Sequence, residues 1–135
     1  MLNKLLLSLV VFFVAVGIIA QPLNTAPEVS IDIVPEPIDG GIITQSVVDL
    51  VIGAVDPDGD SVVRLQLELN DRLIFDEVFA PGEFTSPFVY QWRTNRWKGA
   101  PVWIEVYAYD EFGNRGPAYR QVVIPFTKYC GDEPC

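Results

Sequence analysis

The sequence predicts an immunoglobulin-like β-sandwich, in which two antiparallel sheets pack face to face. From residue 28 onward, apolar residues alternate with polar ones in about seven short segments, as in half-buried strands. Turn residues separate these segments about every 8 to 12 residues, which is the spacing of a sandwich. Two acidic turns, 56–60 and 110–114, each close such a segment. In this fold the loops after the second and sixth strands lie at the same pole.

The expected strands follow one another with no helical periodicity between them. Their ranges are 29–33, resuming near 42–43 after a break rich in Pro and Gly, then 47–55, 63–69, 72–79, 88–92, 102–108 and 122–126. Strand side chains alternate between two faces, which assigns one set to the core. The inward set includes Val63, Leu65, Tyr90, Trp92, Val102, Ile104, Val106, Ala108, Val122, Ile124 and Phe126.

An apolar helix is expected before the sandwich. Lys4 precedes an apolar run from Leu5 to Ala20 in which only Ser8 is polar, a pattern typical of a cleavable signal peptide. The alternative is a retained membrane anchor that extends to Leu23. The predicted organisation is a signal peptide or anchor at 1–20, a linker at 21–27, the sandwich at 28–127 and a Cys-bounded tail at 128–135. The chain would then be secreted or lie on the outer side of the membrane.

Charge and composition exclude several functions. The chain has 9 Lys and Arg against 18 Asp and Glu, a net charge of −9, and no His. Because nucleic acids are bound by basic patches, we expect no nucleic-acid partner. An acidic surface suits calcium, cationic partners or simple solubility. Without His there is no Ser-His-Asp arrangement, and we expect no enzyme.

The only two cysteines, Cys130 and Cys135, lie in the tail. Thiols of exported proteins meet an oxidising environment and pair. A local disulfide is expected, since the intervening Gly131 and Pro134 favour a turn. A cross-link between subunits is the alternative.

The two acidic turns predict a calcium site at their shared pole. Calcium takes about 6 to 8 oxygen ligands from carboxylates and carbonyl groups. The candidate ligands are Asp56, Asp58, Asp60, Asp110 and Asn114, with Asn24 as a further oxygen donor. The alternative is turn chemistry alone, in which Asp110 caps its own turn and Asn114 adopts a left-handed conformation.

The sixth strand predicts a binding face on the outside of its sheet. If Val102 and its alternate neighbours face the core, then Trp103, Tyr107 and Tyr109 form an outer row. Arg64 and Tyr119 would join this row from adjacent strands. Aromatic residues with Arg are typical of interface hot spots, and flat aromatic rows also stack on sugar rings. The alternatives are that these side chains form cross-strand pairs or lie beneath the C-terminal tail.

Three segments, 63–73, 86–94 and 104–114, resemble the bacterial immunoglobulin-like domains of surface adhesins and secreted hydrolases. Segment 86–94 is similar to their Pro-aromatic-x-aromatic-x-Trp strand, and segment 104–114 to their closing Ala-x-Asp-x-x-Gly-Asn turn. The acidic turn 56–60 resembles that of cadherin-like and PKD-like relatives. The resemblance covers roughly residues 24–126 and implies a fold more than an activity.

These observations predict an exported, non-catalytic module that binds a protein or a glycan, or mediates adhesion, at the cell envelope. One alternative is a self-assembling subunit of an extracellular filament, in which a strand of one copy completes the sheet of the next. A second is an accessory subunit of an envelope complex, held in the membrane by residues 5–23.

Overall fold

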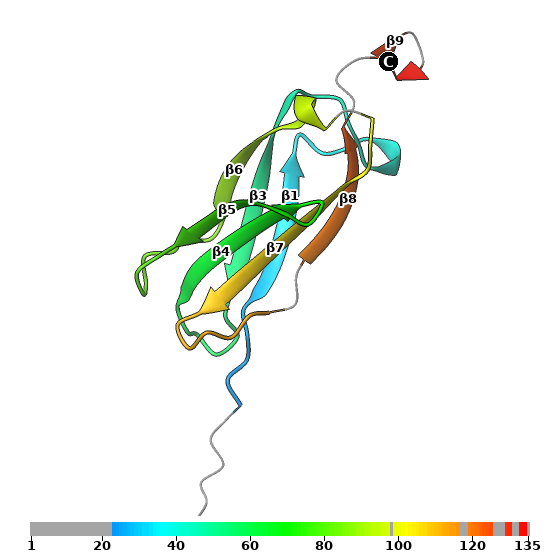
Figure 1. Ribbon diagram of the computed structural model, residues 1–135. Coiled ribbons are helices and arrows are strands. Elements are labelled where there is room, and N and C mark those ends of the chain that lie inside the picture. Colours follow the sequence, from blue (N-terminus) through cyan, green and yellow to red (C-terminus); the bar gives the residue numbers. More distant parts are fainter. Residues whose placement is uncertain (1–22, 98, 117–118, 126–128, 131–132, 135) are drawn as a thin grey trace, which may run out of the picture.

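The computed structural model describes residues 23–97, 99–116, 119–125, 129–130 and 133–134, which form two packed sheets (Figure 1). The expected N-terminal helix lies outside the described residues. Within the described part of the chain, no helix is long and apolar enough to cross a membrane.

Eight strands make up the two sheets, against about seven expected. The three-stranded sheet has the order β1 (Glu28–Val34), β3 (Val47–Val55), β6 (Phe88–Arg93). The five-stranded sheet has the order β2 (Ile42–Ile43), β8 (Tyr119–Pro125), β7 (Val102–Asp110), β4 (Val62–Leu69), β5 (Arg72–Val78). All neighbours are antiparallel except β2 and β8, which are parallel. A small separate hairpin pairs β9 (Tyr129–Cys130) with β10 (Glu133–Pro134).

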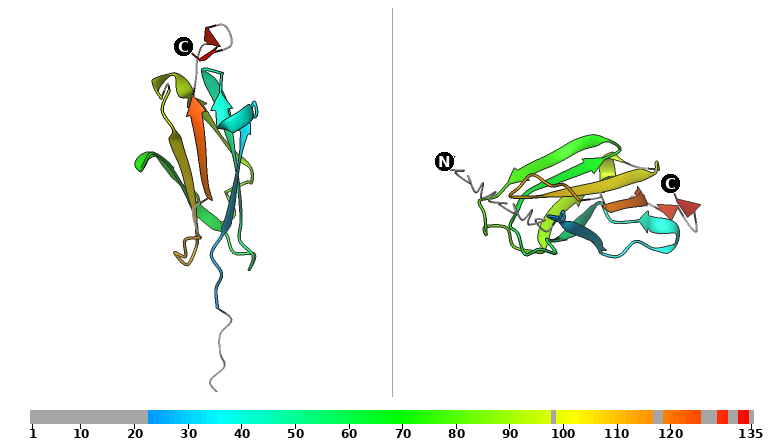
Figure 2. Two further views of the ribbon diagram at one scale, coloured as in Figure 1. Left: turned by 90° about the vertical axis from the view of Figure 1, so that its right-hand side faces the viewer. Right: turned by 90° about the horizontal axis from the view of Figure 1, so that it is seen from below.

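The additional strand arises because the chain changes sheets after β1. Pro35 and Pro37 interrupt β1, and proline cannot donate a ladder hydrogen bond. The 3₁₀ turn η1 (Asp39–Gly41) then redirects the chain, with Gly40 and Gly41 at φ of 76° and 78°, where glycine is favoured. The chain crosses to the opposite sheet and pairs as β2 alongside β8 (Figure 2).

Alternating side chains from both sheets fill the core. In β7 the residues Val102, Ile104, Val106 and Ala108 are fully buried, which confirms the predicted phase of that strand. Leu65 and Leu67 of β4 and Leu50 and Ile52 of β3 are also fully buried, and Trp92 of β6 is 2% exposed. Burial of each large aliphatic side chain stabilises the fold by about 1.5–3 kcal/mol relative to exposure.

The predicted phase of the last strand was wrong. Val123 is fully buried opposite Val102, whereas Val122 is 39% exposed opposite Trp103. Ile124 is half-buried, and Phe126 lies outside the described residues. Residues 122–126 are all apolar, so the sequence carries no alternation from which the phase could be read.

The start of β4 also differs from the prediction. Val62 is buried and Val63 only half-buried, because the pairing with β7 shifts register between Val62 and Arg64. Such a bulge reverses the faces on its two sides. Tyr90, expected inside, is half-buried and packs against the core from its margin.

Candidate functional site

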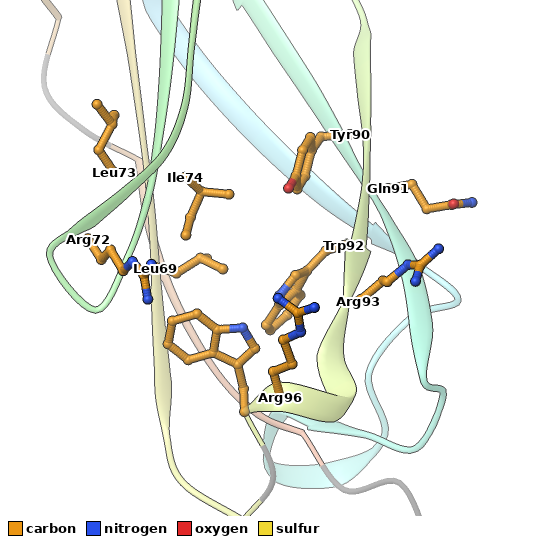
Figure 3. A pocket seen from close by; sticks show the side chains of 10 residues that line it. Leu69, Arg72, Leu73, Ile74, Tyr90, Gln91, Trp92, Arg93 and Arg96 are labelled. Carbon is orange, nitrogen blue, oxygen red and sulfur yellow. The ribbon is translucent and has the colours of Figure 1, made fainter.

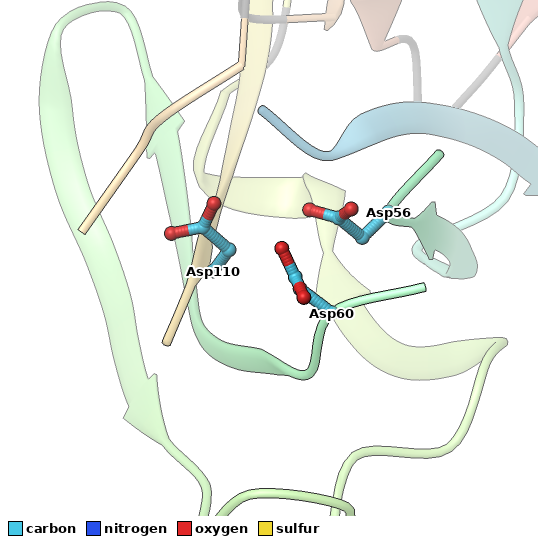
Figure 4. A group of neighbouring side chains, drawn as sticks. All are labelled: Asp56, Asp60 and Asp110. Carbon is cyan, nitrogen blue, oxygen red and sulfur yellow. The ribbon is translucent and has the colours of Figure 1, made fainter. Parts of the chain in front are cut away.

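Three carboxylates meet at one pole of the sandwich. Asp56 follows β3, Asp60 precedes β4, and Asp110 ends β7. Each offers a carboxylate oxygen within 4.8 Å of the others, and Figure 4 shows the three side chains converging, two from the loop between β3 and β4 and one from the end of β7. The two acidic turns therefore share a pole, as the sandwich topology predicted.

Asp56 is buried, and only one of its two carboxylate oxygens accepts a hydrogen bond from the described residues. The side chain is 6% exposed, and its Oδ1 accepts a hydrogen bond from the backbone N–H of Asp58 at 2.8 Å. Gly59, at φ 81°, donates its N–H to the Asp56 carbonyl and closes the turn. Oδ2 is buried and has no hydrogen-bond partner among the described residues. A buried, unpartnered carboxylate oxygen is costly, and a cation would offset that cost.

Asp110 organises the loop that follows it. It is 1% exposed, and its Oδ1 accepts hydrogen bonds from the backbone N–H groups of Phe112 and Asn114 at 2.9 and 2.8 Å. Its Oδ2 accepts from the Asn114 side-chain amide at 2.9 Å. Gly113, at φ 85°, provides the left-handed residue of this turn, and Asn114 has no positive φ. Asp110 thus has a structural role whether or not a metal binds.

Asp60 lies in an unfavourable electrostatic environment. Its pKa is raised, first by burial and then by the neighbouring carboxylates of Asp56, Glu111, Asp58 and Asp110. A carboxyl group with a raised pKa binds its proton more tightly in the folded state. Stability therefore falls as the pH rises through that pKa. A divalent cation at this pole would offset the part of this rise that comes from the neighbouring carboxylates.

The segment before β1 completes the pole. The backbone N–H of Thr25 donates to Asp58 Oδ2 at 2.5 Å. The neighbouring Asn24 has a buried Oδ1 with no hydrogen-bond partner among the described residues. Gly116 packs so closely on Pro27 that a Cβ there would collide with the Pro27 carbonyl oxygen. This contact fixes the segment against the loop between β7 and β8.

The structure brings together only three of the five calcium ligands that the sequence predicted. Asp56, Asp60 and Asp110 come together. Asp58 is exposed and bonds to Thr25, while the amide group of Asn114 donates to Asp110. Asn24, which the sequence offered only as a further oxygen donor, has the unpartnered oxygen that Asn114 was expected to supply.

The aromatic residues of β7 lie on the outer face, in the predicted phase. Trp103 is 41% exposed, whereas Tyr107 and Tyr109 are half-buried. The guanidinium group of Arg64 lies 5.2 Å from the Tyr109 ring centroid, and that of Arg115 lies 4.6 Å from the Tyr107 centroid. These cation–π contacts cover the two rings and engage them within the molecule.

The two tyrosine hydroxyl groups are also engaged. The Tyr109 hydroxyl group donates to Gln66 Oε1 at 2.7 Å, and the Tyr107 hydroxyl group donates to Glu105 Oε2 at 3.3 Å. Burial and the nearby Glu105 and Glu68 carboxylates raise the pKa of Tyr107. The contacts of Tyr109 with Gln66 and Arg64 are cross-strand pairs, the alternative expected from the sequence, whereas Tyr107 contacts its own strand and the loop that follows.

Two further residues bear on this face. Sequence reasoning missed Arg115, because its place over Tyr107 depends on the path of the loop after β7. The side chain of Tyr119 lies outside the described part of the structure. Its backbone pairs with Val106, a core position of β7, and that of Arg120 pairs with Glu105.

Arg64 is further held by a bidentate ion pair with Asp76 of β5. Its Nε donates to Oδ1 at 2.7 Å, and its Nη2 donates to Oδ2 at 2.5 Å. Gln66 donates to the same carboxylate at 3.1 Å. These hydrogen bonds, that of Arg64 foremost, lower the pKa of Asp76 to about 2.

This lowered pKa predicts a loss of stability in acid. A carboxyl group has a pKa of about 3.9 when unfolded, so the contribution of Asp76 is complete above about pH 4. It is lost as the pH falls through about 2. Asp76→Asn should flatten the acid limb of a urea-unfolding pH profile in this range. Glu77→Gln, at an exposed neighbour, should leave the limb unchanged, and equal flattening by both would contradict the assignment.

The predicted disulfide between Cys130 and Cys135 stays a prediction. Cys135 lies outside the described residues, and only the backbone of Cys130 is described, as part of β9.

No protein-family model matches this chain, and no curated protein matches it. The solved structures that resemble it include three from different proteins. The fibronectin(III)-like modules of Clostridium thermocellum CbhA align with a TM-score of 0.54 and 16% identity, over 78% of this chain and 50% of theirs. The PKD domain of an M14-like peptidase from Thermoplasmatales archaeon SCGC AB-540-F20 aligns with a TM-score of 0.49 and 20% identity, over 76% and 99%. The Clostridium perfringens spore cortex lytic enzyme SleM aligns with a TM-score of 0.44 and 13% identity, over 73% and 27%.

The chain thus spans half the length of the CbhA chain that it matches. At this level of identity, the likeness concerns the fold alone. The architecture agrees with this likeness, because one sheet has three strands and the other five, and the chain changes sheets between β1 and β2. The chain has an immunoglobulin-like β-sandwich fold.

Proposed function

We propose that this chain is an exported, non-catalytic immunoglobulin-like module that binds a protein or a glycan at the cell envelope and is stabilised by calcium at its acidic pole. The observation that carries the calcium proposal is the buried, unpartnered Oδ2 of Asp56 beside the carboxylates of Asp60 and Asp110. Oxygen-only donor sets of this kind suit Ca²⁺. Asn24 Oδ1, also buried and unpartnered, would supply a neutral fourth side-chain ligand.

Calcium at this pole would connect three parts of the chain. Asp56 and Asp60 belong to the loop after β3, Asp110 to the end of β7, and Asn24 to the segment before β1. A shared ion would fix the direction in which the chain enters the sandwich. The ion would thereby hold the sandwich at a defined angle to the segment before β1.

The proposal predicts that calcium raises the melting temperature. An ion that binds only the native state stabilises it by about 1.4 kcal/mol at ten times its Kd, which is a rise of roughly 5 °C for a domain of this size. Asp60→Asn should abolish this rise. It should also raise the melting temperature in EDTA, because Asp60 is repelled by its neighbours. Thermal unfolding in EDTA and in a calcium series would measure both effects.

Asp39→Asn provides the matched control, since Asp39 is exposed in η1 and outside the carboxylate trio. It should keep the full calcium response. If the melting temperature does not change up to millimolar calcium, the pole consists of ordinary turns. If magnesium raises the melting temperature as much as calcium does, the effect is one of charge screening, and the site does not select calcium.

A further inference from the structure

A groove opens between the free edges of the two sheets. It has a volume of about 690 Å³, within the range of roughly 300–1,000 Å³ for ligand sites. Figure 3 shows its walls: the end of β4 and the start of β5 on one side, and β6 with the turn η2 (Thr94–Arg96) on the other. Arg93 at its rim pairs with Val47, the first residue of β3, whereas the acidic pole follows the last. The groove is thus remote from the proposed calcium site.

Packing explains why the sheets separate at this point. Phe75 of β5 stacks on Tyr90 of β6 with ring centroids 5.1 Å apart, and lies 5.5 Å from Phe88. These contacts close the edge as far as Tyr90. Beyond it, a register shift in the pairing of β4 with β5 leaves Ile74 without a partner. Such bulges redirect side chains, and Ile74 lines the groove.

The charge of the groove is opposite to that of the molecule. Arg72, Arg93 and Arg96 line it, with the side chain of Arg93 on the outward side of β6, and no Asp or Glu does. The whole chain has only 9 basic residues against 18 acidic ones. Between described residues the one ion pair joins Arg64 and Asp76, so these three guanidinium groups have no carboxylate partner there. Guanidinium groups bind carboxylates through paired hydrogen bonds.

The inner wall holds a donor without an acceptor. Trp92 lines the groove, and its Nε1 is buried with no hydrogen-bond partner among the described residues. Buried indole N–H groups normally find an acceptor. A ligand oxygen that reaches the inner wall of the groove would supply one.

The shape of the groove favours a peptide over a sugar. Within the described chain, β6 pairs only with β3, and β5 only with β4, so each has a free edge to which an extended peptide can add main-chain hydrogen bonds. Leu69 and Ile74 add an aliphatic wall, which suits an apolar side chain. A sugar would use the aromatic rings but neither of these features.

We propose that this groove binds an extended acidic peptide segment of a partner protein, with an apolar side chain between β5 and β6 and its carboxylates on Arg72 and Arg96. This rests on the proposed binding function, for which it defines a site and a class of partner, and it does not involve the calcium pole.

Fluorescence anisotropy with the full chain and a fluorescein-labelled peptide, Glu-Asp-Leu-Glu-Leu-Asp-Glu, tests the proposal. Arg96→Gln and Arg72→Gln should each raise Kd about fivefold or more, which corresponds to about 1 kcal/mol, a cost that only a minority of interface residues exceed. Arg115→Gln removes the same charge outside the groove and should change Kd less than twofold. A peptide with Ser in place of Leu has the same charge and should bind more weakly.

Each other outcome overturns the proposal. The proposal is wrong if the peptide does not bind at millimolar concentration. It is also wrong if Arg115→Gln weakens peptide binding as much as the groove variants do, because the attraction would then depend only on the overall charge of the chain. Tighter binding of oligogalacturonate than of the peptide would assign the groove to an acidic glycan. Dimerisation that Arg96→Gln abolishes, without peptide binding, would assign it to a second copy of this chain. Asp60→Asn should leave peptide binding unchanged, so that failure of the calcium site and failure of the groove are distinguishable.

Discussion

Replacing Trp92 with alanine is expected to lower the free energy of unfolding by about 3 to 5 kcal/mol, the range for truncating a large buried aromatic residue. The Trp92 side chain is 2% exposed, and in the pairing of β6 with β3 it lies opposite Val48, which is 1% exposed. Its removal leaves a cavity between the sheets. Urea denaturation monitored by circular dichroism would measure the change, and a cost below about 1 kcal/mol would contradict the buried placement.

Two variants separate the causes of this loss. Trp92→Phe keeps much of the ring volume and removes the N–H that lacks an acceptor. Its cost should stay below about 1.5 kcal/mol. Trp103→Ala removes an indole that is 41% exposed on the outer face, and should cost about 1 kcal/mol or less. Equal losses for Trp92→Ala and Trp103→Ala would mean that the outer face contributes as much to stability as the core.

The contrast between Trp92 and Val122 shows what the sequence could predict about the fold. In β6, Trp92 stands between Gln91 and Arg93, so only one phase buries the indole and leaves the polar side chains in water, and the structure confirms that phase. In β8 every residue from 122 to 125 is apolar, and the register with β7 decides which ones are buried. Val63 was misplaced for a related reason, because a register shift leaves no mark in the residue pattern.

The candidate sites differ in the same way. The meeting of Asp56, Asp60 and Asp110 follows from a general property of sandwich loops, which is why the sequence could predict it. Which oxygen atoms remain free depends on individual backbone N–H groups, such as those of Asp58 and Asn114, and could not be predicted.

The groove could not be predicted at all. Arg72 and Arg96 lie far apart in the sequence, and they come together only because the edges of two different sheets lie side by side.

Asp110→Ala is expected to lower the free energy of unfolding by about 2 to 3 kcal/mol in the absence of calcium. Three donors lose their acceptor: the backbone N–H groups of Phe112 and Asn114 and the Asn114 side-chain amide. Each donor left unsatisfied in a part-buried site costs about 1 kcal/mol or more. Denaturant unfolding in EDTA would measure this loss, and a value below about 0.5 kcal/mol would mean that the loop forms without Asp110.

Asp110→Asn separates the structural role of Asp110 from its proposed role as a ligand. An amide oxygen can still accept from the two backbone N–H groups, and the Asn114 amide can rotate to present its oxygen to the new NH₂ group. In EDTA this variant should therefore retain most of the stability that Asp110→Ala loses. In calcium it should lose most of the stabilisation of the native chain, because a hard cation binds a neutral amide more weakly than a carboxylate. If Asp110→Asn keeps the full calcium response, the ion does not bind through Asp110, and the three carboxylates meet only to shape two turns.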